Sequence, residues 1–129
     1  MKLEGFYYTI LGIEHQEDAA IFQVGLWANC DIYRGHFPGH PVCPGVCNMQ
    51  MIKECAEILT GKRLHASKVK QCRLTALATP EECPMLNVKI AILSNDEAHY
   101  AVKASIYDEQ CIYMDYKGEM SELTKRKSY

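Results

Sequence analysis

The chain begins with two segments in which apolar residues, many of them β-branched or aromatic, are interspersed with polar ones. They are EGFYYTILGIE, residues 4–14, and AAIFQVGLWAN, residues 19–29, and the polar stretch HQED lies between them. Such segments, bounded by turn-forming residues, are typical of β-strands. In the second half of the chain, partial alternation predicts four further strands, at residues 65–78, 85–94, 99–108 and 111–120. The short stretches TPEECP, NDEA and EQ separate these four, and the two-residue EQ link predicts a tight hairpin.

Between the two groups of strands the apolar period changes to that of a helix, which we predict at Pro44–Thr60. Pro44 suits the first helical position, and Gly61 suits the position just past the end. At 100° per residue a broad apolar arc is formed by Cys47, Met51, Ile52, Cys55, Ala56, Ile58 and Leu59. The opposite, polar side carries Gln50, Lys53, Glu54, Glu57 and Thr60. Asn48 breaks the pattern because it falls inside the apolar arc, where a buried amide needs hydrogen-bond partners.

The order of elements is therefore two strands, one long helix and then an antiparallel meander. One apolar helix combined with a sheet indicates an α+β fold in which the sheet wraps around the helix. The length of 129 residues suits one domain, and no linker or repeat divides residues 1–129. A single sheet around one helix leaves an edge strand, so we expect dimerisation through that edge.

Charge and hydropathy exclude several functional classes. A net charge of −2 and a pI near 6.2 argue against a nucleic-acid-binding protein, which usually has a strongly basic face. No apolar run approaches the roughly 18 residues of a membrane-spanning helix. The N-terminal stretch MKLEGFYYTI lacks the apolar core of a signal peptide. We therefore expect a cytoplasmic protein that binds neither nucleic acid nor membrane.

The seven cysteines are predicted to be free thiols. Their number is odd and no export signal accompanies them, and buried cysteine in a reducing compartment behaves as a small hydrophobic residue. Histidine and cysteine are good zinc ligands, but the prolines among the four nearest candidates impose an extended path, which disfavours a metal site. Those candidates are His36, His40, Cys43 and Cys47.

The stretch GHFPGHPVCPGVCNMQMIKE, residues 35–54, places a histidine and two Pro-Gly steps directly before the predicted helix. Histidine takes and returns a proton near neutral pH, and the prolines would limit the freedom of the loop that carries His36. The helix start at Gly45 and Val46 offers unpaired N–H groups and the positive end of the helix dipole. N–H groups in this position stabilise negative charge that develops on a bound oxygen atom. Because Gly45 has no Cβ, a ligand can approach the backbone closely.

This stretch resembles the signature of the 3-hydroxyacyl-acyl-carrier-protein dehydratases of fatty-acid synthesis, which have the hot-dog fold. The family pattern is His-Phe-Pro-Gly-x-Pro, two residues and then Pro-Gly-Val, and it matches residues 36–46. Gln50 stands where the family has its catalytic Glu or Asp. The likeness continues through residues 68–93, where EECP replaces the Pro-Gly-Asp turn that is usual in the family.

The resemblance implies a hot-dog fold and dehydration of 3-hydroxyacyl thioesters, carried by acyl carrier protein, to trans-2-enoyl thioesters. It implies that His36 is the general base, that Phe37 contacts substrate, and that the N–H groups of Gly45 and Val46 hold the thioester carbonyl. In this family the base and the acid come from opposite subunits. His36 of one chain is therefore expected to face Gln50 of its partner in a homodimer, in a larger assembly of dimers, or in a heterodimer with a paralogue. No metal or other cofactor is implied.

The amide at Gln50 leaves three interpretations open. An amide donates a hydrogen bond but does not yield a proton near neutral pH, and losing a general acid costs about 10²–10⁴-fold in rate. The chain either dehydrates with water or His36 carrying the proton, or is a non-catalytic acyl-binding subunit that completes an acid-bearing paralogue's site. The third interpretation is a thioesterase, although that activity normally needs a carboxylate. An ordinary surface amide or a subunit contact explains Gln50 equally well.

Four other residues have two interpretations each. Glu54, one helical turn after Gln50, is a candidate substitute acid, but a solvated carboxylate paired with a lysine is simpler. Asn48 either narrows or polarises the acyl tunnel or bonds a strand carbonyl. Lys62 and Arg63, with the basic tail TKRKSY, either steer an acidic carrier protein or are simply solvated.

Overall fold

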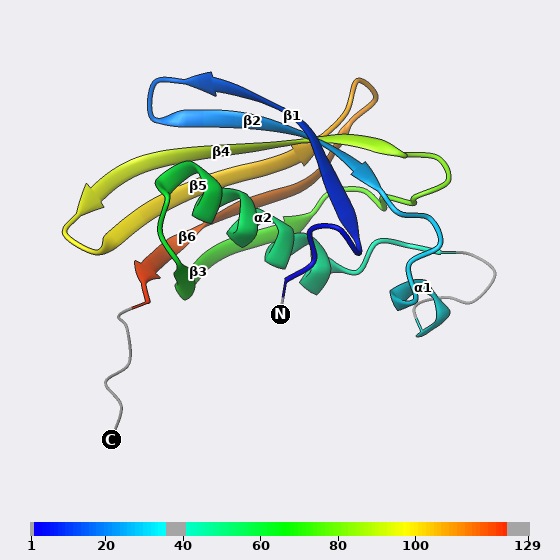
Figure 1. The fold of residues 1–129 in the computed structure, drawn as a ribbon, viewed down its shortest axis with the longest axis horizontal. Coiled ribbons are helices and arrows are strands. Elements are labelled where there is room, and N and C mark those ends of the chain that lie inside the picture. The colour runs from blue at the N-terminus through cyan, green and yellow to red at the C-terminus, as the bar shows by residue number, and fades with distance from the viewer. Residues whose placement is uncertain (1, 36–40, 124–129) are drawn as a thin grey trace.

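The structure is a computed structural model, and it describes residues 2–35 and 41–123. A curved sheet lies against one long helix, and a short helix sits near one end of the sheet (Figure 1). The strands are β1 (Tyr8–Gln16), β2 (Ala19–Leu26), β3 (Leu64–Leu74), β4 (Met85–Asp96), β5 (His99–Tyr107) and β6 (Ile112–Glu122). The helices are α1 (Ile32–Gly35) and α2 (Gly45–Thr60). This arrangement confirms the predicted α+β class.

The sheet is antiparallel throughout, with strand order β1-β2-β4-β5-β6-β3. Two hairpins turn over just two residues, because Gln16 pairs with Ala19 and Asp96 pairs with His99. The turn residues are 17–18 in the first hairpin and 97–98 in the second. One residue in each turn, Asp18 and Glu97, has the left-handed conformation (φ 56° in each). Positive φ is typical of such tight hairpin turns.

The sequence prediction was wrong about the neighbours of β3. We expected a meander running from residues 65–78 into β4, but β3 pairs with β6, and residues 75–84 connect it to β4 across the sheet. The β5–β6 link is also longer than the predicted two-residue turn, since Tyr107 pairs with Ile112. Asp108 explains the wider loop, because its Oδ1 accepts hydrogen bonds from the N–H groups of Gln110 (2.8 Å) and Cys111 (3.1 Å). Such Asx turns stabilise a loop without glycine.

Helix α2 packs its apolar side on the sheet and forms the centre of the core. Met51, Ile52, Cys55 and Ala56 are fully buried, as the predicted arc requires, whereas Ile58 is 45% exposed. The glycine prediction at the helix end is confirmed, since Gly61 follows Thr60 in the left-handed conformation (φ 71°) and its N–H donates to the Glu57 carbonyl. The helix begins at Gly45, one residue after the predicted start, and Pro44 is its N-cap.

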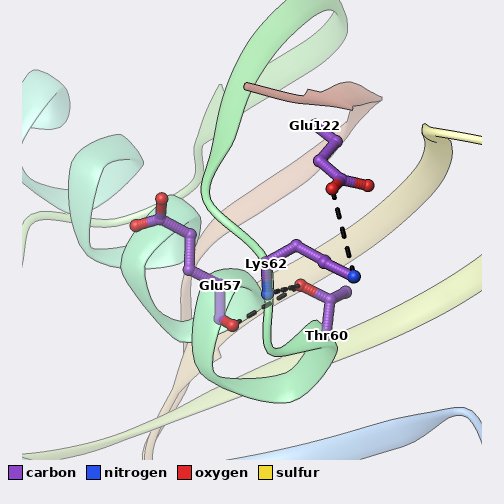
Figure 2. A network of polar contacts seen from close by, with 4 residues as sticks. All are labelled: Glu57, Thr60, Lys62 and Glu122. Carbon is purple, nitrogen blue, oxygen red and sulfur yellow. Dashed lines mark hydrogen bonds and ion pairs between the residues drawn. The ribbon is translucent and has the colours of Figure 1, made fainter. Parts of the chain in front are cut away.

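The C-terminal end of α2 is joined to the neighbouring strands by polar contacts (Figure 2). The Thr60 hydroxyl donates to the helix carbonyls of Ala56 (2.9 Å) and Glu57 (3.5 Å), and it accepts from the Lys62 N–H (3.3 Å). The Lys62 ammonium lies 4.0 Å from the Glu122 carboxylate of β6. The Glu57 carboxylate accepts a hydrogen bond from the first N–H of β3, at Leu64. These contacts fix the path of the chain from the end of α2 to the start of β3.

The N-terminal segment before β1 covers part of the side of α2 that the sequence suggested was solvated. Leu3 and Tyr7 of this segment, and Tyr8 at the start of β1, are completely buried. Leu3 and Tyr8 both contact Glu54 of α2, and Figure 1 shows the segment passing close to the helix. The cysteine prediction is confirmed: all seven are free thiols, and only Cys72 and Cys111 are exposed.

Candidate functional site

The proposed base lies outside the described residues. His36 and Phe37 fall in the stretch 36–40, which connects the end of α1 at Gly35 to Pro41. Their roles therefore remain sequence predictions. The structure describes the segment that follows, where Cys43 is buried and its N–H donates to the Ala78 carbonyl (2.8 Å). This hydrogen bond anchors the approach to α2 on the β3–β4 connection.

The start of α2 has the open N–H groups that the sequence predicted. Pro44 provides no side-chain cap, and its carbonyl accepts from Cys47 and Asn48 (3.1 Å each). Within residues 2–35 and 41–123, no acceptor is found for the N–H of Gly45 or Val46. Unsatisfied N–H groups at a helix start attract partial negative charge. That these N–H groups bind an oxyanion or carbonyl stays a prediction from the sequence.

Gly45 and Val46 differ in their surroundings. A Cβ on Gly45 would lie 3.3 Å from Leu74 Cδ1 at the end of β3, so the glycine lets that leucine approach the helix start. The Val46 side chain is 74% exposed in the single chain.

A groove of about 190 Å³ runs beside the first two turns of α2 and brings Val46 and Gln50 together. Its lining comes from α2, β3 and β6, namely Val46, Met49, Gln50, Lys53, Ala66, Tyr116 and Met120. A separate, larger cavity of about 600 Å³ lies along the polar side of the helix toward Gly61 and Arg63, with Tyr8, Ile10 and Glu54 in its wall. Gln50 and Lys53 line both spaces.

The prediction of a solvated Glu54 was wrong. Glu54 is only 5% exposed, and its carboxylate accepts hydrogen bonds from the N–H groups of Leu3 (2.7 Å) and Glu4 (3.0 Å). It also accepts from the Tyr8 hydroxyl (3.0 Å) and from Gln50 Nε2 (2.9 Å). Burial, with further contributions from Cys55 and Glu54, raises the pKa of Tyr8 well above its usual value, which keeps this phenol a donor. Glu54 was missed because its cover comes from residues about fifty positions earlier in the chain.

Asn48 is buried, as its place in the apolar arc required, and it has a partner that the sequence did not indicate. Its Oδ1 accepts a hydrogen bond from the Tyr7 hydroxyl (2.8 Å) rather than bonding a strand carbonyl through its amide. Desolvation is the largest cause that raises the pKa of Tyr7 far above the normal range. The Asn48–Tyr7 pair thus joins α2 to the N-terminal segment six residues before Glu54 does.

Cofactor and membrane features can be assessed for the described part of the chain only. Among residues 2–35 and 41–123, no three His, Cys, Asp or Glu side chains are grouped so that they would hold a metal ion. His36 and His40, two of the four candidate metal ligands in the sequence, lie outside those residues. Neither described helix is long and apolar enough to cross a membrane.

Comparison with solved structures assigns the fold. The chain superposes on the dehydratase heterocomplex ApeI:P from Xenorhabdus doucetiae with a TM-score of 0.69 and 20% identity, covering 88% of this chain and 96% of that chain. A protein from Lactococcus lactis, yhdA, provisionally named as a thioesterase, gives a TM-score of 0.67 and 11% identity over 95% and 96% of the two chains. At these identities the likeness establishes the fold alone. The fold is the hot-dog fold that the sequence predicted.

Sequence comparison then assigns the family. The ApeI-like family, described as ApeI dehydratase, matches residues 12–113, so the chain belongs to the ApeI-like dehydratase family. The 3-hydroxyacyl-[acyl-carrier-protein] dehydratase FabZ of Ralstonia nicotianae is 30% identical over 91 residues, 63% of this chain and 56% of the relative. The FabZ of Lactiplantibacillus plantarum is 24% identical over 94 residues, 67% of this chain and 64% of the relative. The chain thus spans less than two thirds of the length of these curated relatives.

Proposed function

We propose that this chain acts in the dehydration of 3-hydroxyacyl thioesters, carried by acyl carrier protein, to trans-2-enoyl thioesters. The observation that supports this most directly is the uncapped start of α2 beside a groove that Val46 and Gln50 both line. A thioester carbonyl held by the N–H groups of Gly45 and Val46 would place its acyl chain along that groove, with Phe37 of the preceding loop as a further contact. The names of the FabZ relatives support the same substrate class.

The reaction assigns one role to each site residue. His36 removes the proton from C2, and the helix start stabilises the enolate-like charge on the thioester oxygen. Gln50 orients the 3-hydroxyl group. The C3–O bond then breaks, and the protonated His36 returns its proton so that the hydroxyl leaves as water. One imidazole therefore acts first as base and then as acid, which compensates for the missing carboxyl group at Gln50.

We propose that the site is completed by a second hot-dog subunit paired along β3. This strand is at the sheet edge, and residues 65–74 are all exposed. Edge strands with unpaired backbone groups are natural positions for pairing with another chain. Bulges at 66–68 and 69–71 restrict which partner strand fits in register. The subunit is either a second copy or a paralogue.

A non-catalytic role beside a paralogue is the second candidate. One of the similar solved structures is itself a dehydratase heterocomplex, and Gln50 lacks a transferable proton. In this arrangement the present chain supplies His36 to a partner that carries the acid. A thioesterase has less support, since Glu54, the carboxylate nearest to Gln50, already accepts four hydrogen bonds and is not arranged to activate water.

The test measures enoyl-thioester formation and free-thiol release in parallel. Purified chain is mixed with 3-hydroxyacyl carrier protein, alone and with each hot-dog dehydratase encoded beside it. Product from the chain alone supports the first proposal, and product only in the mixture supports the second. Free thiol would indicate a thioesterase. His36→Gln serves as the chemical control, and His15→Gln, at an exposed histidine of β1, is the matched control; activity that survives His36→Gln contradicts the mechanism.

The contact between Gln50 and Glu54 affects how a carboxylic acid at position 50 would behave. Gln50→Glu alone would put two carboxyl groups within hydrogen-bond distance, so that one of them holds a proton at neutral pH. We expect this variant to dehydrate about 10-fold or more faster than the wild type below pH 7 and to lose that gain at higher pH, where both carboxyls ionise. The exchange variant Gln50→Glu/Glu54→Gln keeps an amide donor beside the new acid. Unchanged rates in both variants would place residue 50 outside the site.

A further inference from the structure

The face of the sheet that points away from α2 carries a cluster of basic side chains. Successive residues of a strand lie on opposite faces of a sheet, and Val102 and Ala104 of β5 are buried in the core. Lys103 between them is exposed and therefore lies on the outer face, and the register places five further basic residues there. We call the six residues the basic face: Lys68, Lys70, Arg73, Lys89, Lys103 and Lys117. All of them are exposed except Lys89, which is half-buried.

The positive charge of the basic face is only partly balanced. Lys70 and Arg73 of β3 form ion pairs with carboxylates of β6, at 3.7 Å and 3.8 Å. Within the part of the chain that the structure describes, the other four basic residues form no ion pair. Lys103 also lies directly opposite Lys117 in the β5–β6 pairing, and like charges in that position repel each other and destabilise a sheet. A bound anionic partner would relieve this repulsion.

The shape of the basic face favours a macromolecule over a small ligand. Strands β4, β5, β6 and β3 are neighbours in the sheet, and four neighbouring strands span about 14 Å. That width is close to the diameter of an α-helix with its side chains, roughly 10–12 Å. Small ligands bind in concave pockets, whereas neither the groove beside α2 nor the larger cavity is lined by any of the six basic residues. An acidic helix on the surface of another protein therefore fits the basic face.

The basic face reaches the candidate site around the end of β3. Arg73 is followed by Leu74, the last residue of that strand. The Leu74 side chain lies beside the first turn of α2, since a Cβ on Gly45 would be 3.3 Å from Leu74 Cδ1. The N–H groups that are proposed to hold the thioester carbonyl are therefore close to one end of the basic face.

We propose that the basic face docks the acidic carrier protein that brings the acyl thioester to the start of α2. This docking role rests on the proposed dehydration of carrier-linked thioesters. The sequence suggested Lys62 and Arg63 for the same purpose, but both follow the C-terminal end of α2, and the Lys62 ammonium lies 4.0 Å from Glu122. The basic tail that the sequence also suggested, residues 124–129, lies outside the described residues.

The first test measures binding and does not depend on turnover. Apo acyl carrier protein, which holds no acyl chain, is titrated with the wild type and with two variants that change the net charge equally. Lys103→Glu/Lys117→Glu reverses the centre of the basic face and is expected to raise Kd at least about 10-fold. Lys62→Glu/Arg63→Glu is the matched control and should change Kd by less than about twofold, because salt screens charges that lie far from the docked surface. Equal weakening in both variants would overturn the docking role, and so would tighter binding of the wild type to double-stranded DNA or to phosphatidylserine vesicles than to the carrier protein.

The second test uses turnover in the assembly that proves active. With 3-hydroxyacyl carrier protein as substrate, Lys103→Glu/Lys117→Glu should lower kcat/KM at least about 10-fold. With the same acyl group on N-acetylcysteamine, a small thiol without a protein surface, kcat/KM should stay within about twofold of the wild type, which also shows that the variant is folded. Equal losses on the two substrates would overturn the docking role only. A wild type that binds the carrier protein but forms no enoyl product, alone or with a paralogue, would support the docking role and overturn the proposed function.

Discussion

At the scale of single residues, Tyr116 of β6 is a buried polar group without compensation. It is 3% exposed, and its hydroxyl has no hydrogen-bond partner within the described residues. Burial raises the pKa of this phenol, as expected for a desolvated hydroxyl that is harder to ionise. An unsatisfied buried hydroxyl lowers stability by about 1–3 kcal/mol relative to a satisfied one.

We therefore expect Tyr116→Phe to leave the free energy of unfolding unchanged or to raise it by about 1 kcal/mol. Tyr113→Phe is the matched substitution on the same strand, because the Tyr113 hydroxyl donates to Asp108 (2.7 Å) and accepts from the Cys83 thiol (3.2 Å). That variant should lower stability. Urea unfolding monitored by circular dichroism measures both, and a greater loss in Tyr116→Phe than in Tyr113→Phe would show that the Tyr116 hydroxyl has a partner in solution.

The residues that the sequence misjudged share one physical cause. The sequence placed Gln50 on the polar side of the helix, where it is half-buried, and correctly placed Asn48 inside the apolar arc, where it is buried. It misjudged Glu54 because local periodicity reports which side of a helix a residue occupies, and not what covers that side. Here the cover is the N-terminal segment, which no helical pattern encodes. The hydrogen bond from Tyr7 to Asn48 comes from the same segment and was missed for the same reason.

At the scale of elements, local signals sufficed wherever partners are adjacent in sequence. The helix and the β1–β2 and β4–β5 hairpins follow from Gly61, from the polar turns and from alternation. The position of β3 does not follow, because its partner β6 begins 38 residues after β3 ends and nothing in either strand specifies that pairing. Only closure of the sheet around α2 selects it. The groove of the proposed site could not be predicted from the sequence for the same reason, because its walls come from α2, β3 and β6.

A substitution at Gly118 of β6 tests how closely the backbones of β3 and β6 pack at this position. A Cβ at this position would lie 2.5 Å from the Lys68 carbonyl oxygen and 3.0 Å from the Tyr116 hydroxyl. Because the first atom belongs to the backbone of the bulged strand, Gly118→Ala should destabilise the fold by about 1–3 kcal/mol. Gly25→Ala in β2 meets only Leu11 side-chain atoms, at 3.4 Å or more, and should change stability by less than about 0.5 kcal/mol. Thermal unfolding that ranks the two variants equally would contradict this view of the β3–β6 pairing.

At the scale of the whole molecule, the buried thiols and phenols predict sensitivity to alkali. Burial raises the pKa of Cys55 to about 12, and Tyr7 and Tyr8 are also shifted upward. Between about pH 9 and pH 12 the unfolded chain has lost the Cys55 proton and the folded chain retains it. The free energy of unfolding therefore falls as pH rises, by about 1.4 kcal/mol per pH unit for each such group, and the stabilisation is complete below about pH 8.5.

Urea unfolding at pH 8, 9 and 10 measures this slope. Cys55→Ala should be less stable than the wild type at pH 8, because it leaves a small cavity. Its stability should nevertheless fall less steeply above pH 9, since one of the groups that release a proton on unfolding is gone. Parallel slopes in the two proteins would mean that the Cys55 thiol ionises equally in the folded and unfolded chains.

Assembly through β3 predicts which thiol becomes protected. Cys72 lies on β3 and Cys111 lies in the β5–β6 loop, and both are exposed in the single chain. If a second subunit pairs along β3, a bulky thiol reagent should modify Cys111 fast and Cys72 at least about 10-fold more slowly in the assembled protein. The variants Cys111→Ser and Cys72→Ser isolate one reactive thiol each, and sedimentation gives the size of the assembly. Equal rates in a protein that sediments as a dimer would place the interface elsewhere, and His36 and Gln50 would then have to meet across a different face.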